Sequence, residues 1–325
     1  MINRTKVDSN TKFIMLIGTP LHQSFAARMQ NAAYEHAHIN MRYFYNEADS
    51  THLEEILIGL RHMSAFAGAA VTRPNKVAVM AHLDEVDPLC EKMGACNTVV
   101  KDEQGRLIGY NTDGIGFLTS LTQDGNFDVK DKTFFCIGAG GAGRSMCSVL
   151  AHAGAKKIYV TDVMEDSARN LVSDINEHFA PVAEQVPFGD FSAVRNSDCV
   201  LNASGIGMGA AIGISPLPAE YIVPGQFYFD ACYNPDKTQF LLNAEAAGCT
   251  ILNGLGMSLH QGAEQIRLWS NEEPPLEVMR QELLTIVDEL NAVNEIADEP
   301  AGTREAMEVM VAAQQPYTAA PEIKE

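Results

Sequence analysis

Two charged residues in the first half of the chain have types and positions that suit proton transfer. Lys76 directly follows AAVTRPN (69–75), whose first residues are typical of a buried strand, and Asp113 lies in GYNTDGIGF (109–117). An alcohol carbon that exchanges a hydride needs a proton carrier at its hydroxyl group, and both side chains can fill that role. Each also has a simpler interpretation, because Lys76 could be a solvated lysine at a helix start and Asp113 a helix N-cap.

The segment FFCIGAGGAGRSM (134–146) contains Gly138-x-Gly140-x-x-Gly143. A strand-like run precedes it, and an amphipathic helix and a second strand follow it, as in dinucleotide-binding folds. The glycines permit a tight turn and a close approach to a pyrophosphate, whose charge the helix N-terminus attracts. Asp162 ends the second strand, where an acidic side chain accepts hydrogen bonds from the ribose of NAD and repels the 2′-phosphate of NADP.

We therefore predict a dinucleotide site in which NAD is favoured and NADP is the second choice. The alternative is a glycine-rich turn that binds no ligand. Taken from the residues alone, the chain is either an NAD-dependent oxidoreductase or an NAD-binding sensor.

The elements that must position these residues alternate between strands and helices, which predicts an α/β fold in layers. A second cycle begins near residue 131 with a strand, the glycine-rich turn, a helix and another strand, over 132–162. Further strands are predicted over 12–18, 41–47, 65–72, 197–204 and 226–232, with a hairpin over 96–112 that turns at DEQG. Helices are predicted over 24–38, 51–63, 76–94 with a turn at Asp87-Pro88, 164–179, 238–248 and 257–291 with a break at Glu273-Pro274-Pro275. The tail holds one candidate helix, over 303–315.

Composition excludes several classes of protein. The net charge of −19 argues against nucleic acid and anionic membranes as partners, although a local cation can still hold a small anionic substrate. We find no apolar core of signal-peptide length at the N-terminus and no run of about 18 apolar residues, so we expect a cytoplasmic protein. The seven cysteines include no C-x-x-C pair and the nine histidines no H-E-x-x-H motif, so we expect reduced thiols and no metal site.

The chain resembles the shikimate dehydrogenases. The strings VTRPNK, GACNTVV, GYNTDGIGF, IGAGGAGRS, NASGIGM, FDACYNP and NGLGMSLHQGAEQIRLW occur in that family's order, over roughly residues 13 to 285. The resemblance implies an N-terminal α/β substrate domain (1–120), a Rossmann-type NAD-binding domain (121–255) and C-terminal helices (256–291) that return to the first domain. It leaves residues 292–325 as a tail, and a homodimer is the assembly that we consider.

The resemblance also implies a reaction and a set of site residues. The reaction is hydride exchange at the ring C3 hydroxyl of shikimate, giving 3-dehydroshikimate, with Lys76 and Asp113 as a coupled catalytic pair. The residues that match substrate contacts are Ser24, Thr72, Asn97, Tyr233 and Gln261. The residues that match cofactor contacts are Gly138, Ala139, Gly140, Gly141, Ala142, Gly143, Asp162, Ala203 and Gly254.

Several departures from the family pattern concern the substrate. In GTPLHQSFAA (18–27), Ser24 matches the first of two serines that hold the substrate carboxylate, but the positions of the pattern's His, second serine and Pro carry other residues. These residues are, in the same order, Gln23, Ala26 and Ala27. Elsewhere in the chain, Ala70 replaces an Asn of the pattern and Gly205 replaces a Pro. Lost hydrogen bonds imply weaker shikimate binding or a different substrate, and either of two arginines, Arg28 and Arg73, could supply a compensating cation.

The cofactor residues depart as well, since Thr161-Asp162-Val163 stands where most members carry Asn-Arg-Thr for the NADP phosphate. Family members that act on quinate often prefer NAD. The alternatives are therefore an NAD-dependent quinate/shikimate dehydrogenase, a dehydrogenase of a related cyclic polyol acid, or a non-catalytic sensor.

Overall fold

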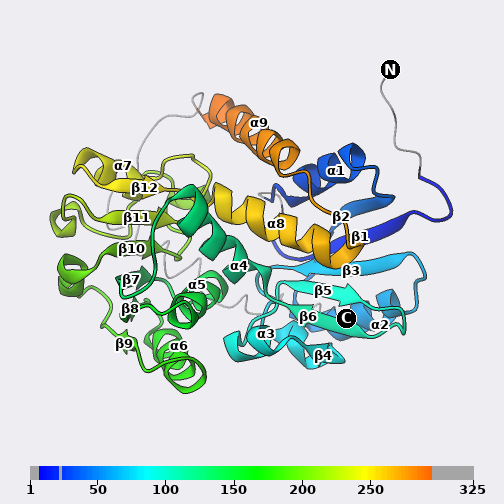
Figure 1. Cartoon of the computed structure of the whole chain (residues 1–325), viewed down its shortest axis with the longest axis horizontal. Coiled ribbons are helices and arrows are strands. Elements are labelled where there is room, and N and C mark those ends of the chain that lie inside the picture. Colours follow the sequence, from blue (N-terminus) through cyan, green and yellow to red (C-terminus); the bar gives the residue numbers. More distant parts are fainter. Residues whose placement is uncertain (1–6, 22–23, 295–325) are drawn as a thin grey trace, which may run out of the picture.

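Two six-stranded sheets form the two halves of the molecule in the computed structural model, which describes residues 7–21 and 24–294 (Figure 1). Each sheet has a buried core on both of its faces, so each half is layered, as the β/α alternation predicted. The predicted helix at 303–315 lies outside the described residues. None of the described helices combines the length and the apolar composition that a membrane-spanning segment requires.

The first sheet is mixed and has the order β2-β1-β3-β5-β6-β4. Strands β1 and β2 and strands β1 and β3 pair in parallel, while β3, β5 and β6 are antiparallel neighbours. Its strands are β1 (Lys12–Gly18), β2 (Met41–Glu47), β3 (Phe66–Val71), β4 (Glu85–Val86), β5 (Thr98–Lys101) and β6 (Leu107–Tyr110). The helices of this half are α1 (Ala26–His36), α2 (Leu53–Arg61), α3 (Pro88–Met93) and α4 (Thr112–Thr119).

The second sheet is parallel throughout and has the order β12-β11-β10-β7-β8-β9. This is the Rossmann order, in which the order of the strands reverses between β7 and β10 and leaves a crevice at the strand ends. Its strands are β7 (Thr133–Ile137), β8 (Lys157–Thr161), β9 (Ala183–Gln185), β10 (Cys199–Asn202), β11 (Phe227–Asp230) and β12 (Thr250–Leu252). The helices are α5 (Gly141–His152), α6 (Glu165–His178) and α7 (Gln239–Ala246). Every residue of β10 and β11 is buried, because helices cover both faces.

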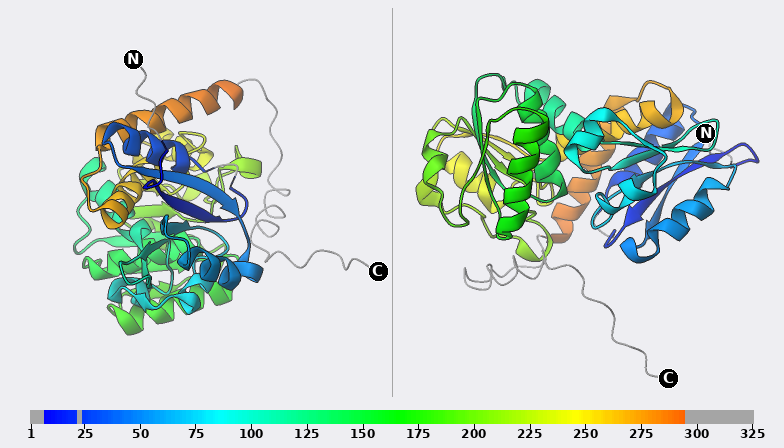
Figure 2. Two further views of the ribbon diagram at one scale, coloured as in Figure 1. Left: turned by 90° about the vertical axis from the view of Figure 1, so that its right-hand side faces the viewer. Right: turned by 90° about the horizontal axis from the view of Figure 1, so that it is seen from below.

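Helices α8 (Leu255–Ser270) and α9 (Leu276–Asn294) return from the second half to the first, as predicted. They share a core with α1, β1 and β2, and Figure 2 shows α9 (orange) where the two halves meet. Trp269 fixes α8 to the first sheet, because its indole N–H donates to Val99 O at 3.0 Å. Gly68 makes room for that ring, since a Cβ there would lie 2.6 Å from Trp269 Nε1.

The structure differs from the sequence prediction mainly in short elements. The first helix predicted within 76–94 is only a 3-10 turn, Ala78–His82, because Asp84 then accepts a hydrogen bond from Leu107 N and the chain joins the sheet edge as β4. Strands β9 and β12 are three-residue edge strands that the pattern did not predict. The remaining short helices are Ser50–His52, Ser192–Asn196, Gly209–Ala211, Ala219–Tyr221 and the π-helix Ser120–Asp124.

Candidate active site

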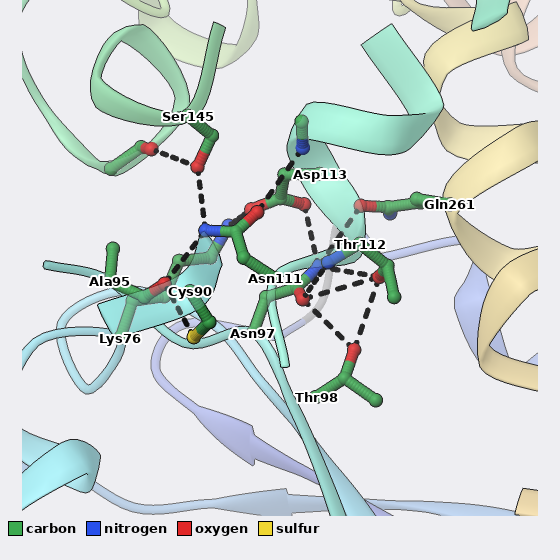
Figure 3. A network of polar contacts seen from close by, with 12 residues as sticks. Lys76, Cys90, Ala95, Asn97, Thr98, Asn111, Thr112, Asp113, Ser145 and Gln261 are labelled. Carbon is green, nitrogen blue, oxygen red and sulfur yellow. Dashed lines mark hydrogen bonds and ion pairs between the residues drawn. The ribbon is translucent and has the colours of Figure 1, made fainter. Parts of the chain in front are cut away.

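Lys76 and Asp113, the two predicted proton carriers, form an ion pair. Lys76 Nζ donates to Asp113 Oδ2 at 2.5 Å (Figure 3), and the two side chains are 19% and 5% exposed. Charges that are shielded from water in this way interact more strongly than they would in bulk solvent. The interpretation of Lys76 as a freely solvated lysine therefore does not hold.

Helix α4 is capped by Asn111 and not by Asp113. Asn111 Oδ1 accepts from Gly114 N at 3.1 Å, and the backbone of Asn111 is extended, as an N-cap requires. Asp113 lies in the first turn of the helix, where the helix dipole favours a negative side chain. The cap therefore leaves the Asp113 carboxylate free to face Lys76.

The Asn97 amide orients the other oxygen of Asp113. Asn97 Nδ2 donates to Asp113 Oδ1 at 2.8 Å, and Asn97 Oδ1 accepts from Thr112 N at 2.8 Å. Gln261 lies at the same amide, with Oε1 at 3.5 Å from Asn97 Nδ2. The structure thus brings four predicted residues together from four parts of the chain (Figure 3).

Two glycines let the helices approach closely enough to assemble this site. A Cβ on Gly116 would lie 2.7 Å from Gln261 N, so α4 and α8 pack backbone to backbone. A Cβ on Gly114 would lie 2.6 Å from Val149 Cγ1, so α4 also packs tightly on α5. Asn111 Nδ2 joins the same two helices by donating to Ser145 Oγ at 2.9 Å. The helix that carries Asp113 is therefore held against the helix that follows the glycine-rich loop.

The glycine-rich loop has the shape that a dinucleotide pyrophosphate requires. Gly138 has a φ of +108°, which disfavours other residues, and a Cβ on Gly143 would lie 2.0 Å from Gly138 O. Helix α5 begins at Gly141, and its N-cap, Gly140, has no side chain to bond the first-turn N–H groups. Those groups can therefore bind an anion, so the residues present fit the cofactor.

Asp162 lies directly against this loop. Its Oδ2 accepts from Ala139 N at 2.6 Å and its Oδ1 from Met164 N at 2.8 Å, and the residue is 5% exposed. The carboxylate thus ties the end of β8 to the loop. Each oxygen keeps a lone pair that could accept a ribose hydroxyl.

The Lys76–Asp113 pair and the glycine-rich loop are neighbours. A Cβ on Gly141 would lie 3.3 Å from Lys76 Cδ, so the lysine stem reaches the start of α5. Two other predicted cofactor residues pack at adjacent strand ends, since a Cβ on Gly138 would meet Ala203 and one on Gly254 would meet Ala231. Within the described ranges, no three His, Cys, Asp or Glu side chains are placed to share a metal ion.

Two predicted substrate residues, Ser24 and Tyr233, lie near each other through aromatic neighbours. Tyr45 Oη donates to Ser24 O at 2.6 Å, and the rings of Phe25 and Tyr233 are 4.9 Å apart. Burial raises the pKa of Tyr233 to about 12, so its phenol stays protonated. The fifth predicted residue, Thr72, lies just past β3, and its methyl group would be 2.3 Å from a Cβ on Gly18.

The positions that depart from the family pattern present apolar or flexible groups. Ala26 and Ala27 pack against the core that contains Ala70, which is 4% exposed. Gly205 has a φ of +79°, which a proline could not adopt, so the chain here takes a path that the family's proline excludes. Gln23 lies outside the described residues.

The two candidate compensating cations differ in availability. Arg28 is ion-paired with Glu282 and Glu289 on α9, so it links α1 to α9. Arg73 is exposed, and its guanidinium forms no ion pair with any residue that the structure describes. Of the two, only Arg73 is therefore free to meet a substrate anion.

Three polar residues of the site were missed from the sequence. These are the Asn111 cap, Thr98 and Gln265, whose Nε2 donates to Thr98 Oγ1 at 3.0 Å. Asn111 had a local signal, because an Asn that follows a strand and precedes a helix is a favoured N-cap. The role of Gln265 depends on a contact between residues 167 positions apart, which leaves no local signal in the sequence.

Comparison with known proteins agrees with this geometry. Residues 16–99 match the family model of the shikimate dehydrogenase substrate binding domain, and residues 254–284 match the shikimate 5'-dehydrogenase C-terminal domain. Shikimate dehydrogenase (NADP(+)) of Moorella thermoacetica is 37% identical over 277 residues, which are 84% of this chain and 93% of the relative. The chain belongs to the shikimate dehydrogenase family.

Solved structures related to this shikimate dehydrogenase family member include two with different ligand states. Shikimate 5-dehydrogenase from Listeria monocytogenes, in complex with shikimate and NAD, is 33% identical with a TM-score of 0.80, covering 86% of this chain and 98% of that one. The ligand-free 5-ketofructose reductase of a Gluconobacter strain is 32% identical with a TM-score of 0.78, covering 86% of this chain and 100% of that one. The family resemblance seen in the sequence and the predicted fold class are confirmed.

Proposed function

We propose that the chain is an NAD(P)-dependent oxidoreductase that interconverts shikimate and 3-dehydroshikimate. The observation that carries this proposal is the Lys76–Asp113 ion pair beside the start of α5, in a member of this family. A lysine that is held by a carboxylate and that borders a dinucleotide loop is positioned to act on a hydroxyl group at the reacting carbon.

The residues divide the work as follows. Lys76 as an ammonium donates a proton to the oxygen of the forming alcohol, and in the other direction neutral Lys76 accepts the hydroxyl proton. The Asp113 carboxylate compensates the ammonium charge and fixes the direction of Lys76 Nζ. Gln261 and Asn97 offer amide groups for ring hydroxyls. The glycine-rich loop would hold the pyrophosphate of a dinucleotide, whose nicotinamide would supply or accept the hydride.

The test is turnover of purified protein with shikimate, followed by absorbance of the reduced cofactor. Lys76→Ala and Asp113→Asn should each lower kcat by roughly 10²- to 10⁴-fold, because proton transfer typically contributes that much. Lys92→Ala, an exposed lysine on α3, is the matched control and should leave kcat unchanged. Full turnover by Lys76→Ala would show that the catalytic assignment is wrong.

We further propose that NAD is preferred over NADP. The support is the buried Asp162 carboxylate at the loop, followed by Val163 and Met164, which offer no cation to a 2′-phosphate. The Moorella relative is named for NADP(+), whereas the Listeria structure holds NAD, so the family does not decide this preference.

Cofactor preference is measured as the ratio of kcat/KM with NAD to that with NADP. Asp162→Asn removes the charge while keeping one acceptor for a loop N–H, and it should lower the ratio by about 10- to 100-fold. Val163→Arg leaves Asp162 in place and should improve NADP use by supplying a cation. A wild-type ratio below one would contradict the proposed preference.

A dehydrogenase of quinate or of a related cyclic polyol acid is the second candidate. The supporting observation is that Ala26 and Ala70 present no hydrogen-bonding side chain to a substrate. A panel of shikimate and quinate with NAD and NADP, and of 5-ketofructose with NADH and NADPH, ranks these activities by kcat/KM. Cofactor binding without turnover of any panel member would favour the non-catalytic sensor.

We propose domain limits near residues 120 and 255, which separate the strands of the two sheets, with residues 256–291 assigned to the first domain. A cytoplasmic location is supported by seven free cysteines, six of them buried. The homodimer remains a prediction that light scattering would test.

A further inference from the structure

A layer of neutral polar side chains lies directly behind the catalytic pair, where α8 packs on β5. Gln265 is 5% exposed, and Thr98 and Gln30 are completely buried. Gln265 Nε2 donates to Thr98 Oγ1 at 3.0 Å, and Gln265 Oε1 accepts from Gln30 Nε2 at 3.3 Å. Gln30 is anchored in turn by donating to Gly262 O at 3.0 Å. The orientation of the Gln265 amide is therefore set at both ends.

Gln265 and Gln261 lie one helical turn apart on the same face of α8. Gln261 lies at the Asn97 amide and Gln265 at the Thr98 hydroxyl, so two successive turns of the helix contact two successive residues of the chain at β5. Gln261 belongs to the predicted substrate contacts. Gln265 contacts the layer behind them.

The directions of these hydrogen bonds can be assigned from the donors that cannot change. Thr112 N must donate, so the atom of Asn97 that faces it is Oδ1, and Asn97 Nδ2 therefore points at Asp113. Thr98 Oγ1 accepts from Gln265, so the Thr98 hydroxyl hydrogen is free to be donated elsewhere. It can be donated directly to Asn97 Oδ1, at 2.9 Å. It can also be donated to the Thr112 hydroxyl, which in turn donates to the same Asn97 oxygen at 3.2 Å.

This series of hydrogen bonds therefore ends at Asp113. Its Oδ1 receives the Asn97 amide and its Oδ2 receives Lys76. The members behind Asp113 are amides and hydroxyls that do not release a proton near neutral pH. The network can hold the carboxylate in place, but proton exchange must pass through Lys76.

We propose that Gln265 is a positioning residue of the reaction, which fixes Thr98 and, through it, the Asn97 amide that orients Asp113 toward Lys76. The inference rests on the proposed function, because it assigns a part in that reaction to a residue behind the site.

The test compares Gln265→Glu with Gln265→Met. An ionised glutamate keeps the shape and the bond from Gln30, but it can only accept, so it turns the Thr98 hydrogen away from Asn97. Methionine keeps the length and removes the donor. Each variant should lower kcat on the order of tenfold with KM for the substrate changed less than about twofold. Gln281→Glu, at an exposed position on α9, is the control and should leave both constants unchanged.

A double-mutant cycle separates positioning from general loss of packing. Because Gln265 acts through Asn97, Gln265→Met should lower kcat much less in an Asn97→Ala background than in the wild type. The proposal would be overturned if Gln265→Met lowered kcat by the same factor in both backgrounds. It would also be overturned if kcat were unchanged in both Gln265 variants, or if only KM changed.

The same double-mutant cycle can also be measured by urea unfolding of the four proteins, which needs no enzymatic turnover. If the wild type turned over nothing, the proposed function would fail on its own. Coupling between Gln265 and Asn97 in unfolding would then still be expected, and its absence would overturn the positioning role independently. Gln265→Met serves as the folded variant if Gln265→Glu does not fold.

Discussion

Asp230 offers a sharp test of the electrostatics of the second half. It ends β11, is completely buried, and accepts from Asn202 Nδ2 and Cys232 N through Oδ1, both at 2.9 Å, and from Thr238 Oγ1 through Oδ2 at 2.5 Å. Burial outweighs these donors and raises the pKa of Asp230 from 3.8 to about 6. The carboxylate ties together the loops after β10 and β11, and the second loop carries Tyr233.

The expected variant is Asp230→Asn. Its oxygen can keep both N–H donors, and its NH₂ group can donate to Thr238 Oγ1, which turns its hydrogen away. A rise of the pKa from 3.8 to about 6 corresponds to at most about 3 kcal/mol of unfolding free energy. Because the folded pKa is raised, the wild type holds this stabilisation fully below pH 3.8 and loses it as pH rises through about 6.

The assay is urea unfolding of both proteins between pH 4.5 and 8. The variant's unfolding free energy minus that of the wild type should rise by up to about 2 kcal/mol between pH 4.5 and 8 and then level off, because part of the full effect is already lost between pH 3.8 and 4.5. Other carboxylates, such as Asp84 with its lowered pKa, cancel in this difference. Asp166→Asn, at an exposed position, is the control for the same change of residue at the surface. A flat or falling difference for Asp230→Asn would refute the reasoning.

Three further predictions follow from packing, ion pairing and burial. Gly114→Ala should destabilise the fold by about 1–3 kcal/mol and raise KM for the cofactor, because its Cβ would lie 2.6 Å from Val149 on α5. Gly59→Ala is the matched control, because a Cβ there would meet no atom within 4 Å. It should stabilise α2 by about 0.5–1 kcal/mol in thermal unfolding. Arg28→Ala should change KM for anionic substrates less than about twofold, because the Arg28 guanidinium is ion-paired with two glutamates of α9. A large rise in KM would show that Arg28 binds the substrate. Ellman's reagent should modify at most one thiol quickly in the folded protein, that of Cys249, and rapid reaction of several would contradict the buried positions.

Much of the fold was readable because its signals are local. The strand, glycine-rich turn, helix and strand of 132–162 follow from periodicity and from glycine's freedom at Gly138, and the structure places β7, α5 and β8 there. The break between α8 and α9 follows from Pro274 and Pro275. Edge strands of two or three residues were not predicted, because a segment that short shows no hydrophobic periodicity. Their pairing depends on the neighbouring strand instead.

The sequence by itself determined the α/β alternation, the dinucleotide loop and the types of residue available for proton transfer. Only the tertiary structure decided their partners. Lys76 pairs with Asp113, which is 37 positions away, and Arg28 forms an ion pair with α9. Gln265 donates to Thr98, which is 167 positions away. Propensity and periodicity act over a few residues, whereas the partner of a charge or an amide is set by how sheets and helices pack, and that packing is where the site acquires its geometry.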